Sequence, residues 1–399
     1  MTLPVQFNRL ELAGSLGDLG TLLPLAIGMI MINGLTPSGI FFSVGIFYIF
    51  SGLYFRVTTA VQPMKVISAY AVATALDSQQ IMAATLLMAV ILVVIGVSGA
   101  MSWIGRHTTK AVIRGVQLST GVLLMTQGVK CMVGTSTLQQ LNQMAEPYLN
   151  WQQIGPLPIG VPMGIAGALL TLLLLDNRKV PAGLVVVGFG LALGIGMGAY
   201  KSLDRFGLQM NFPALVPFGM PATIDFTFAF FALVLPQIPM TIGNAVLANA
   251  DLSNQYFGDA ARKVTGRSLC LSMALANLLS FLFGGMPMCH GAGGLAAHYR
   301  FGARTAGSNL MIGIFMVAAV LLIGDQLLAL FHLIPIAILG VLLFFAGGQL
   351  ALTIADLHKR SEMFIALCIL GIALGTNLAA GFLAGLVLSL ALSRGRLAP

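Results

Sequence analysis

Long apolar spans alternate with short polar gaps along this chain. Apolar spans of about 20 residues, the length of a membrane-crossing helix, run near residues 12–32, 38–55, 79–103, 112–133, 160–175, 181–199, 226–248, 267–284, 307–323, 327–349, 362–375 and 377–393. Two shorter segments, 57–76 and 285–299, are rich in Gly, Pro and polar residues. If both enter the membrane, the total is 14 segments. The pattern predicts an all-α polytopic membrane protein that spans a lipid bilayer.

Composition supports this reading. Of the 399 residues, 58% are hydrophobic and 8% are charged, whereas soluble proteins carry roughly 25% charged residues. So few charges cannot cover a water-facing surface, and the apolar residues must therefore face lipid. The formal net charge is +8, but no Lys/Arg run is interleaved with aromatic residues, so no nucleic-acid partner is expected. The four cysteines lie far apart without a C-x-x-C pair, and neither a metal nor another cofactor is expected.

The basic residues predict an orientation. If the N-terminus is cytoplasmic and every segment crosses, the outside gaps hold only Lys130, Lys201 and Arg205. The inside gaps hold 16 of the 20 basic residues, namely Arg9, Arg56, Arg106, Lys110, Arg114, Arg178, Lys179, Arg262, Lys263, Arg267, Arg300, Arg304, Lys359, Arg360, Arg394 and Arg396. This asymmetry follows the positive-inside rule. Both termini are therefore predicted in the cytoplasm, and the host is predicted to be the cell's inner or plasma membrane.

The two short segments also predict a repeat. Each is the third segment in a run of seven, and because seven is odd the second run has inverted topology relative to the first. Paired, Gly/Pro-interrupted segments in inverted repeats indicate the central site of a secondary transporter. We therefore expect 7+7 inverted repeats with half-helices at segments 3 and 10.

The first candidate motif for chemistry is ELAGSLGDLGTLLP, which begins at Glu11. It places Ser15, Asp18 and Thr21 at i, i+3 and i+6, roughly on one helical face. A carboxylate within a membrane span is costly and usually functional. Asp18 is therefore interpreted as a proton carrier, a cation ligand or an organiser of the site. The alternative is a hydrogen-bonded structural residue.

The second candidate is VQPMK, which contains Gln62, Met64 and Lys65. Proline suits the first turn of a helix, so a half-helix beginning here would point free backbone N–H groups into the membrane interior. Such an end attracts anions, and Lys65 adds a full positive charge. The alternative is that Lys65 extends to the membrane interface.

The third candidate, MPMCHGAGG, is the counterpart of the second in the other half. Pro287 and the glycines, Gly291 among them, suit an extended stretch followed by a helix start. His290 has three open roles: it binds an anion, carries a proton or satisfies a backbone carbonyl. Cys289 is interpreted as a small packing residue.

The fourth candidate is PQIPMTIGN, in which Pro236 and Pro239 must disturb the helix. Gln237, Thr241 and Asn244 fall on nearly one face. They either offer hydrogen bonds to a substrate or bridge neighbouring helices. Together the four motifs predict two half-helix N-termini facing each other, which suits an oxyanion.

At these residues the chain resembles a known family. ELAGSLGDLGTLLPL and PMCHGAGGLAAHYRFGAR are similar to the two signature motifs of the MOT-type molybdate transporters, a branch of the sulfate permease superfamily. The resemblance covers essentially the whole chain, including the VQPMK segment.

The resemblance implies a uracil-permease-like fold with a core and a gate domain. The core would comprise residues 1–105 and 221–324, and the gate residues 106–200 and 325–399. The substrate would lie between segments 3 and 10, flanked by segments 1 and 8. The resemblance also implies molybdate uptake, no STAS domain after the last span, and a homodimer formed through the gate domains.

The predicted function is secondary active import of molybdate by alternating access. Uptake of a dianion against an inside-negative potential requires co-transported cations, most simply protons, and Asp18 and His290 are the predicted coupling residues. The predicted substrate-binding residues are Ser15, Thr21, Gln62, Met64, Lys65, Gln237, Thr241, Asn244, His290 and Gly291. Sulfate, tungstate or a nucleobase as substrate, and an anion channel, remain alternatives. Neither H-E-x-x-H nor G-x-S-x-G occurs, so an enzyme is not expected.

Overall fold

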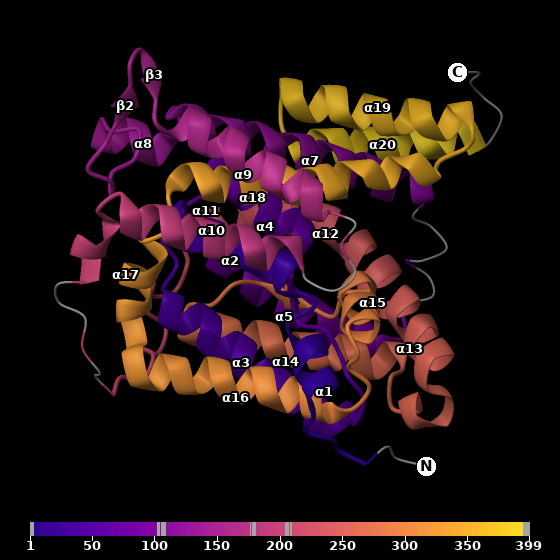
Figure 1. Cartoon of the computed structure of the whole chain (residues 1–399). Helices are drawn as coiled ribbons and strands as arrows, with labels where there is room; N and C mark the ends of the chain where they lie inside the picture. The colour runs from indigo at the N-terminus through magenta and orange to yellow at the C-terminus, as the bar shows by residue number, and fades with distance from the viewer. Residues whose placement is uncertain are drawn as a thin grey trace.

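The computed structural model describes residues 4–101, 104, 109–175, 177, 181–203, 207 and 210–393. The fold is helical, as predicted, with two pairs of two-residue strands (Figure 1). The first half contains α1 (Arg9–Ser15), α2 (Leu19–Met31), α3 (Pro37–Phe55), β1 (Gln62–Pro63), α4 (Lys65–Thr74), α5 (Ser78–Ser98), α7 (Lys110–Val133), α8 (Thr137–Asn142), β2 (Gln153–Ile154), β3 (Leu157–Pro158), α9 (Gly160–Leu174), α10 (Ala182–Gly196) and η1 (Ala199–Leu203).

The second half continues with α11 (Thr223–Ala229), η2 (Phe230–Val234), α12 (Leu235–Met240), η3 (Thr241–Ala248), α13 (Asn249–Phe257), η4 (Gly258–Ala261), α14 (Gly266–Phe283), β4 (Met288–Cys289), α15 (Ala292–Arg300), α16 (Ala306–Ile323), η5 (Gly324–Gln326), α17 (Leu327–Phe331), α18 (Ile336–Ala351), η6 (Leu352–Asp356), α19 (Arg360–Gly375) and α20 (Leu378–Ser393). Six of the basic residues used for orientation, Arg106, Arg178, Lys179, Arg205, Arg394 and Arg396, lie outside the described residues. The orientation therefore stays a prediction.

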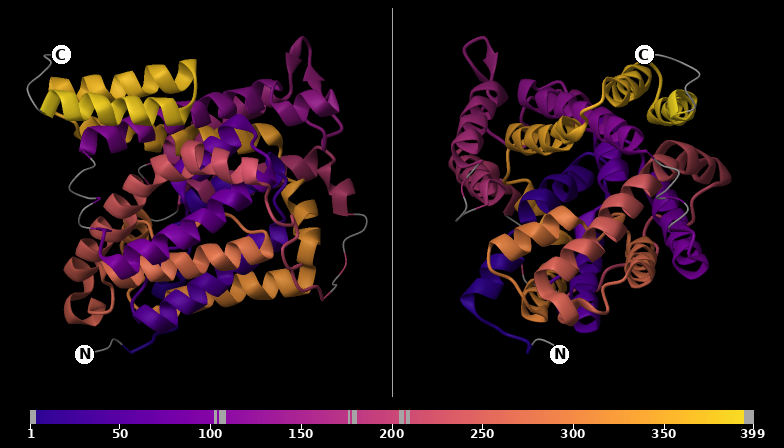
Figure 2. Two further views of the ribbon diagram at one scale, coloured as in Figure 1. Left: turned by 180° about the vertical axis from the view of Figure 1, so that it is seen from behind. Right: turned by 90° about the vertical axis from the view of Figure 1, so that its right-hand side faces the viewer.

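The helices form two groups, one above the other in Figures 1 and 2. We call them the α7–α18 bundle (α7, α9, α10 and α18 to α20) and the α4–α15 bundle (α1 to α5 and α11 to α16). Helix α16 packs along α3, α14 along α5, and α18 along α7. In each pair one helix comes from each half of the chain. Such reciprocal pairing is what two related halves would produce, while the inverted repeat itself stays a prediction.

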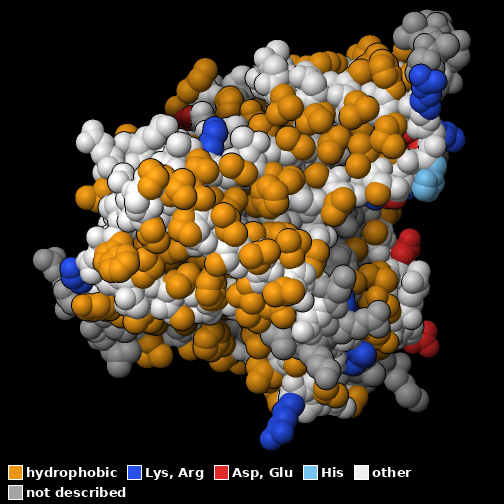
Figure 3. Space-filling model, turned by 45° about the horizontal axis from the view of Figure 1, so that its top comes forward, with side chains coloured by type: hydrophobic (Ala, Val, Ile, Leu, Met, Phe, Trp, Pro, Cys, Tyr) orange, Lys and Arg blue, Asp and Glu red, His pale blue; other side chains and the backbone are white. Residues whose placement is uncertain are grey.

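The outer surface is apolar. Within the described residues, six helices are long and apolar enough to cross a membrane, or seven if α1 and α2, bent by 42° at their junction, count as one span. Large apolar side chains such as Leu173, Phe315 and Val387 point outward with 83%, 71% and 66% exposure. Figure 3 shows such side chains spread over one whole face, with Lys and Arg near its edges. The protein is thus an integral membrane protein, and the count of 14 segments stays a prediction.

The two short Gly/Pro segments meet at the centre of the α4–α15 bundle. Their extended parts pair as antiparallel strands β1 and β4, with Gln62 opposite Cys289 and Pro63 opposite Met288. Each strand leads directly into a short helix, α4 or α15. The sequence prediction of an extended stretch followed by a helix start is therefore confirmed for 285–299. A half-helix also begins within 57–76, but it begins at Lys65, and Pro63 lies in β1 and not in the first helical turn as predicted.

The helix with two prolines is continuous over 223–261 rather than broken. It accommodates Pro236 and Pro239 by widening into two π-helical stretches, η2 before them and η3 after them. Proline removes an N–H donor and clashes with the preceding turn, and the turn that precedes Pro236 is the π-helical η2. The predicted disturbance is confirmed, and its form is a change of helical pitch.

Candidate functional site

A cavity of about 400 Å³ lies between the two bundles. Its polar lining residues are Thr21, Lys65 and Asn244 from the α4–α15 bundle, and Arg114, Gln117, Thr171, Gln349 and Thr353 from the α7–α18 bundle and the adjoining η6. Among the described residues that line it, the charged ones are Lys65 and Arg114, and both are cationic. A cavity of this size with convergent polar groups is the usual form of a small-molecule site.

Helix α15 presents its N-terminus to this cavity. Its N-cap residue, Gly291, has no side chain to cap the helix, and no other side chain among the described residues is seen to accept from its first N–H groups. The first N–H groups of a helix have no partner within the helix. Gly293, at the second helical position, lines the cavity, and a Cβ built there would meet no atom within 4 Å. The start of α15 is therefore an open set of backbone donors at the cavity wall.

Helix α4 presents a charge instead. Lys65, its first residue, lines the cavity. The next two N–H groups are already occupied, because Gln237 Oε1 accepts from Val66 N at 2.9 Å and from Ile67 N at 3.2 Å. Gln237 in turn donates to Thr241 Oγ1 at 2.9 Å. The structure thus places Gln237 and Thr241 behind the cavity wall, where they cap α4.

Asp18 lies in the break between α1 and α2, 2% exposed. Its Oδ1 accepts a hydrogen bond from Gln62 Nε2 at 2.6 Å. Its Oδ2 has no hydrogen-bond partner among the described residues. The charges of Asp18 and Lys65 act on each other. Asp18 is therefore buried against the start of α15, near enough to Lys65 for the two charges to interact, and it is not among the residues that line the cavity.

Two glycines of α15 make room for this pair. A Cβ at Gly291 would overlap Gln62 Oε1, and a Cβ at Gly294 would overlap Asp18 Oδ2 and come within 2.6 Å of Ala60 Cβ. Only glycine lets the α15 backbone approach Asp18 and Gln62 so closely. The motif around Gly291 is thus a packing requirement as well as a helix start.

His290 is held on both sides. Its Nδ1 pairs with the Ala60 carbonyl oxygen at 2.9 Å and its Nε2 with Ser272 Oγ at 3.0 Å. The ring is fully buried and packs 4.7 Å from the Phe47 ring, centroid to centroid. Of the three roles that the sequence left open, this geometry fits the bridging of two segments.

Two other predicted residues also lie away from the cavity. Met64 is fully buried at the N-cap of α4, and its N–H donates to the Pro287 carbonyl at 2.8 Å. Ser15 donates to the Leu12 carbonyl at 2.8 Å and faces a separate, shallow apolar pocket near Phe315. Of the predicted binding residues, the structure therefore brings Thr21, Lys65 and Asn244 to the cavity.

The sequence interpretation missed the polar wall of the α7–α18 bundle. Arg114 entered it only as one more basic residue of an inside gap, and Gln117, Gln349 and Thr353 did not enter it at all. A signal existed: Arg114 and Gln117 stand at i and i+3, and Gln349 and Thr353 at i and i+4. Each pair shares one helical face at the end of a predicted span.

Comparison with known proteins places the chain in context. The family model described as "Molybdate transporter of MFS superfamily" matches residues 10–124 and 229–350. Molybdate transporter 2 of Arabidopsis thaliana is 31% identical over 416 residues, which cover 96% of this chain and 87% of that protein.

Solved structures share the fold. The transmembrane domain of the cyanobacterium bicarbonate transporter BicA superposes with a TM-score of 0.68 at 16% identity, covering 96% of this chain and 98% of that one. The murine anion transporter Slc26a9, in an inward-facing state, gives a TM-score of 0.70 at 13% identity, covering 98% of this chain and 69% of that one. The fold is therefore that of SLC26 and sulfate permease transporters.

Proposed function

This chain belongs to the molybdate transporter family, and from that premise we propose that it imports molybdate through the cavity between its two bundles. The observation that carries the proposal is the charge of the lining. Lys65 and Arg114 are its charged residues within the described part of the chain, and the uncapped start of α15 adds backbone donors at Gly293. Cations and a helix N-terminus are the groups that stabilise an oxyanion.

The proposed coupling to protons is supported by the burial of Asp18 and by the electrostatic interaction of its charge with that of Lys65. When Asp18 is ionised, its charge offsets that of Lys65 and opposes a dianion in the cavity. When Asp18 is protonated, the Lys65 charge is uncompensated and favours the dianion. Proton and molybdate then bind together, which is the requirement for symport. We assign the coupling to Asp18 in preference to His290, because both ring nitrogens of His290 are held by Ala60 and Ser272.

Protons are also required energetically. Each charge moved across the membrane against 100 mV costs about 2.3 kcal/mol, so a dianion costs about twice that. Two co-transported protons would make the loaded site electrically neutral. In this scheme residues 1–105 and 221–324 act as the core and residues 106–200 and 325–399 as the gate, in a homodimer with cytoplasmic termini.

The test is uptake of radiolabelled molybdate by proteoliposomes with and without an inward proton gradient. The wild type is expected to concentrate molybdate only with the gradient. Asp18→Asn should lose gradient-driven accumulation, whereas Asp251→Asn, which removes an exposed carboxylate of α13, should retain it. Gradient-independent uptake by the wild type, or full gradient-driven uptake by Asp18→Asn, would contradict the coupling.

The substrate is tested separately from the coupling. Competition of molybdate uptake by tungstate, sulfate and uracil ranks the tetrahedral dianions against a neutral ring. Molybdate is expected to compete best and uracil not at all. Flux that never saturates with substrate concentration would indicate a channel.

A further inference from the structure

Arg114 on α7 reaches the cavity from the wall opposite Lys65. The family motifs and the half-helices all lie in the α4–α15 bundle, so this cation is the charged lining residue that the other bundle contributes among the described residues. Its side chain is 25% exposed, which leaves it both anchored and accessible.

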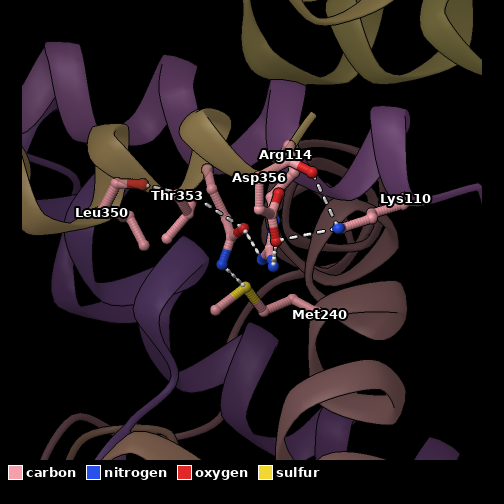
Figure 4. Close-up of polar contacts among 7 residues, drawn as sticks. Lys110, Arg114, Met240, Leu350, Thr353 and Asp356 are labelled. Carbon is pink, nitrogen blue, oxygen red and sulfur yellow. Dashed lines mark hydrogen bonds and ion pairs between the residues drawn. The ribbon is translucent and has the colours of Figure 1, made fainter. Parts of the chain in front are cut away.

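The contacts of Arg114 are shown in Figure 4. Its Nε donates to Asp356 Oδ1 at 3.0 Å, its Nη2 to Asp356 Oδ2 at 2.5 Å, and its Nη1 to Gln117 Oε1 at 2.7 Å. A guanidinium has five N–H donors, so one N–H on each terminal nitrogen has no acceptor among the described residues. Asp356 therefore occupies one edge of the guanidinium and leaves donors at its end.

Asp356 has a second cationic partner that does not line the cavity. Lys110 Nζ lies 3.1 Å from Asp356 Oδ2 and donates to the Asp356 carbonyl oxygen at 3.0 Å. Two cations thus share one carboxylate. If Asp356 releases Arg114, Lys110 still holds it, so the exchange leaves no carboxylate unpaired.

The same cluster connects the two bundles. Gln117 Nε2 donates to the Met240 sulfur atom at 2.9 Å, and Thr353 donates to Gln117 Oε1 at 3.0 Å (Figure 4). Met240 ends α12, the helix whose Gln237 caps α4. Gln117 therefore connects Arg114 to the helix that supports the opposite wall.

We propose that Arg114 is a second anion-binding residue of the cavity and that Asp356 is a resident counter-anion, which a tetrahedral oxyanion displaces from Arg114. The identity of the anion rests on the proposed function. A planar guanidinium fork binds carboxylates and tetrahedral oxyanions with the same paired hydrogen bonds, so the two compete for one group. A dianion carries twice the charge of the carboxylate, and Lys110 retains the carboxylate that leaves.

The test is the dissociation constant of molybdate, tungstate and sulfate for purified protein in nanodiscs, measured by calorimetry at fixed ionic strength. Asp356→Asn removes the competitor and is expected to tighten binding about threefold or more. Arg114→Gln is expected to weaken it about tenfold, the effect of losing charge-assisted hydrogen bonds. Lys130→Gln is the matched control: it removes the same charge from an exposed position in the last turn of the same helix, away from the cavity, and is expected to change affinity less than about twofold.

The double variant Arg114→Gln/Asp356→Asn removes the pair together and leaves no unpaired charge, so it reports on Arg114 even if the single variant does not fold. It is expected to bind as weakly as Arg114→Gln. Wild-type affinity in either Arg114 variant, or equal weakening by Lys130→Gln, would overturn the assignment while leaving molybdate transport intact. If the wild type binds none of the three dianions, both the assignment and the proposed function fail.

Discussion

The two half-helices that meet at the cavity have similar surroundings but contribute differently to it. The first backbone donors of α4 are capped by an amide, Gln237, and the helix offers the charge of Lys65. The start of α15 has no side-chain cap and offers backbone at Gly293. Helix α4 therefore supplies a charge that acts over a long range. Helix α15 supplies backbone donors that act over a short range and in fixed directions. A third helix start, that of α18, is capped by a carboxylate, Glu146.

The largest expected effect is the loss of the charge on α4. Lys65→Met should lower molybdate uptake about 100-fold, because charge-assisted hydrogen bonds to an anion are lost together with the attraction. Lys65→Arg should keep a substantial part of the activity, since it retains the charge. Initial rates in proteoliposomes measure both. Equal activity of the Met and Arg variants would show that the α4 charge is not used.

The next effect tests the open backbone of α15. Gly293→Ala should fold normally, because its Cβ meets no atom within 4 Å, yet weaken molybdate affinity about tenfold by covering a donor. Gly294→Ala is the matched neighbour. Its Cβ overlaps Asp18 and Ala60, so it should lower the stability by about 1–3 kcal/mol. Thermal unfolding measures the stability of each variant, and calorimetry measures its affinity for molybdate. A loss of stability in Gly293→Ala, with Gly294→Ala unaffected, would contradict this geometry.

A smaller effect is expected from uncapping α4. Gln237→Met leaves the N–H groups of Val66 and Ile67 without their acceptor, which should lower the stability by about 1 kcal/mol. It should also make the start of α4 resemble that of α15. Thermal unfolding measures the loss, with Gln140→Met, an exposed amide of α8, as the control. Equal melting temperatures for Gln237→Met and Gln140→Met would show that the Gln237 cap does not stabilise the start of α4.

The last effect depends on pH and concerns the carboxylate cap of α18. Burial raises the pKa of Glu146 from 4.5 to about 7, opposed by its hydrogen bonds from Ala337 N and Ile336 N. The folded state therefore binds the proton more tightly than the unfolded state, and the contribution of Glu146 to stability falls as the pH rises from about 4.5 to about 7. The melting temperature of the wild type minus that of Glu146→Gln should fall over this interval and then level off. A difference that rises with pH would show that the hydrogen bonds from the start of α18 lower the pKa of Glu146 more than burial raises it.

The fold was largely predictable from the sequence, because lipid imposes one solution on an apolar span. Gly, Pro and polar residues inside such spans also marked the four motifs that build the site. Their individual roles depended on long-range geometry. Gln237 caps a helix 171 residues away, and the pairing of Gln62 with Asp18 depends on where the strand segment lies against the break after α1. Arg114 escaped notice because a basic residue near a span end is ordinarily explained by membrane orientation alone.

The β1–β4 pair limits the ways in which this molecule can move. Its ladder and the Met64 N–H bond to Pro287 join the starts of α4 and α15 through backbone. The side-chain amide of Asn277 on α14 in addition accepts from Met288 N and donates to its carbonyl oxygen. The spacing between Lys65 and Gly293 is then nearly a constant of the structure. In the proposed alternating access, a bound anion would therefore move together with both half-helices, and the movement that exposes it to either side would take place between the two bundles.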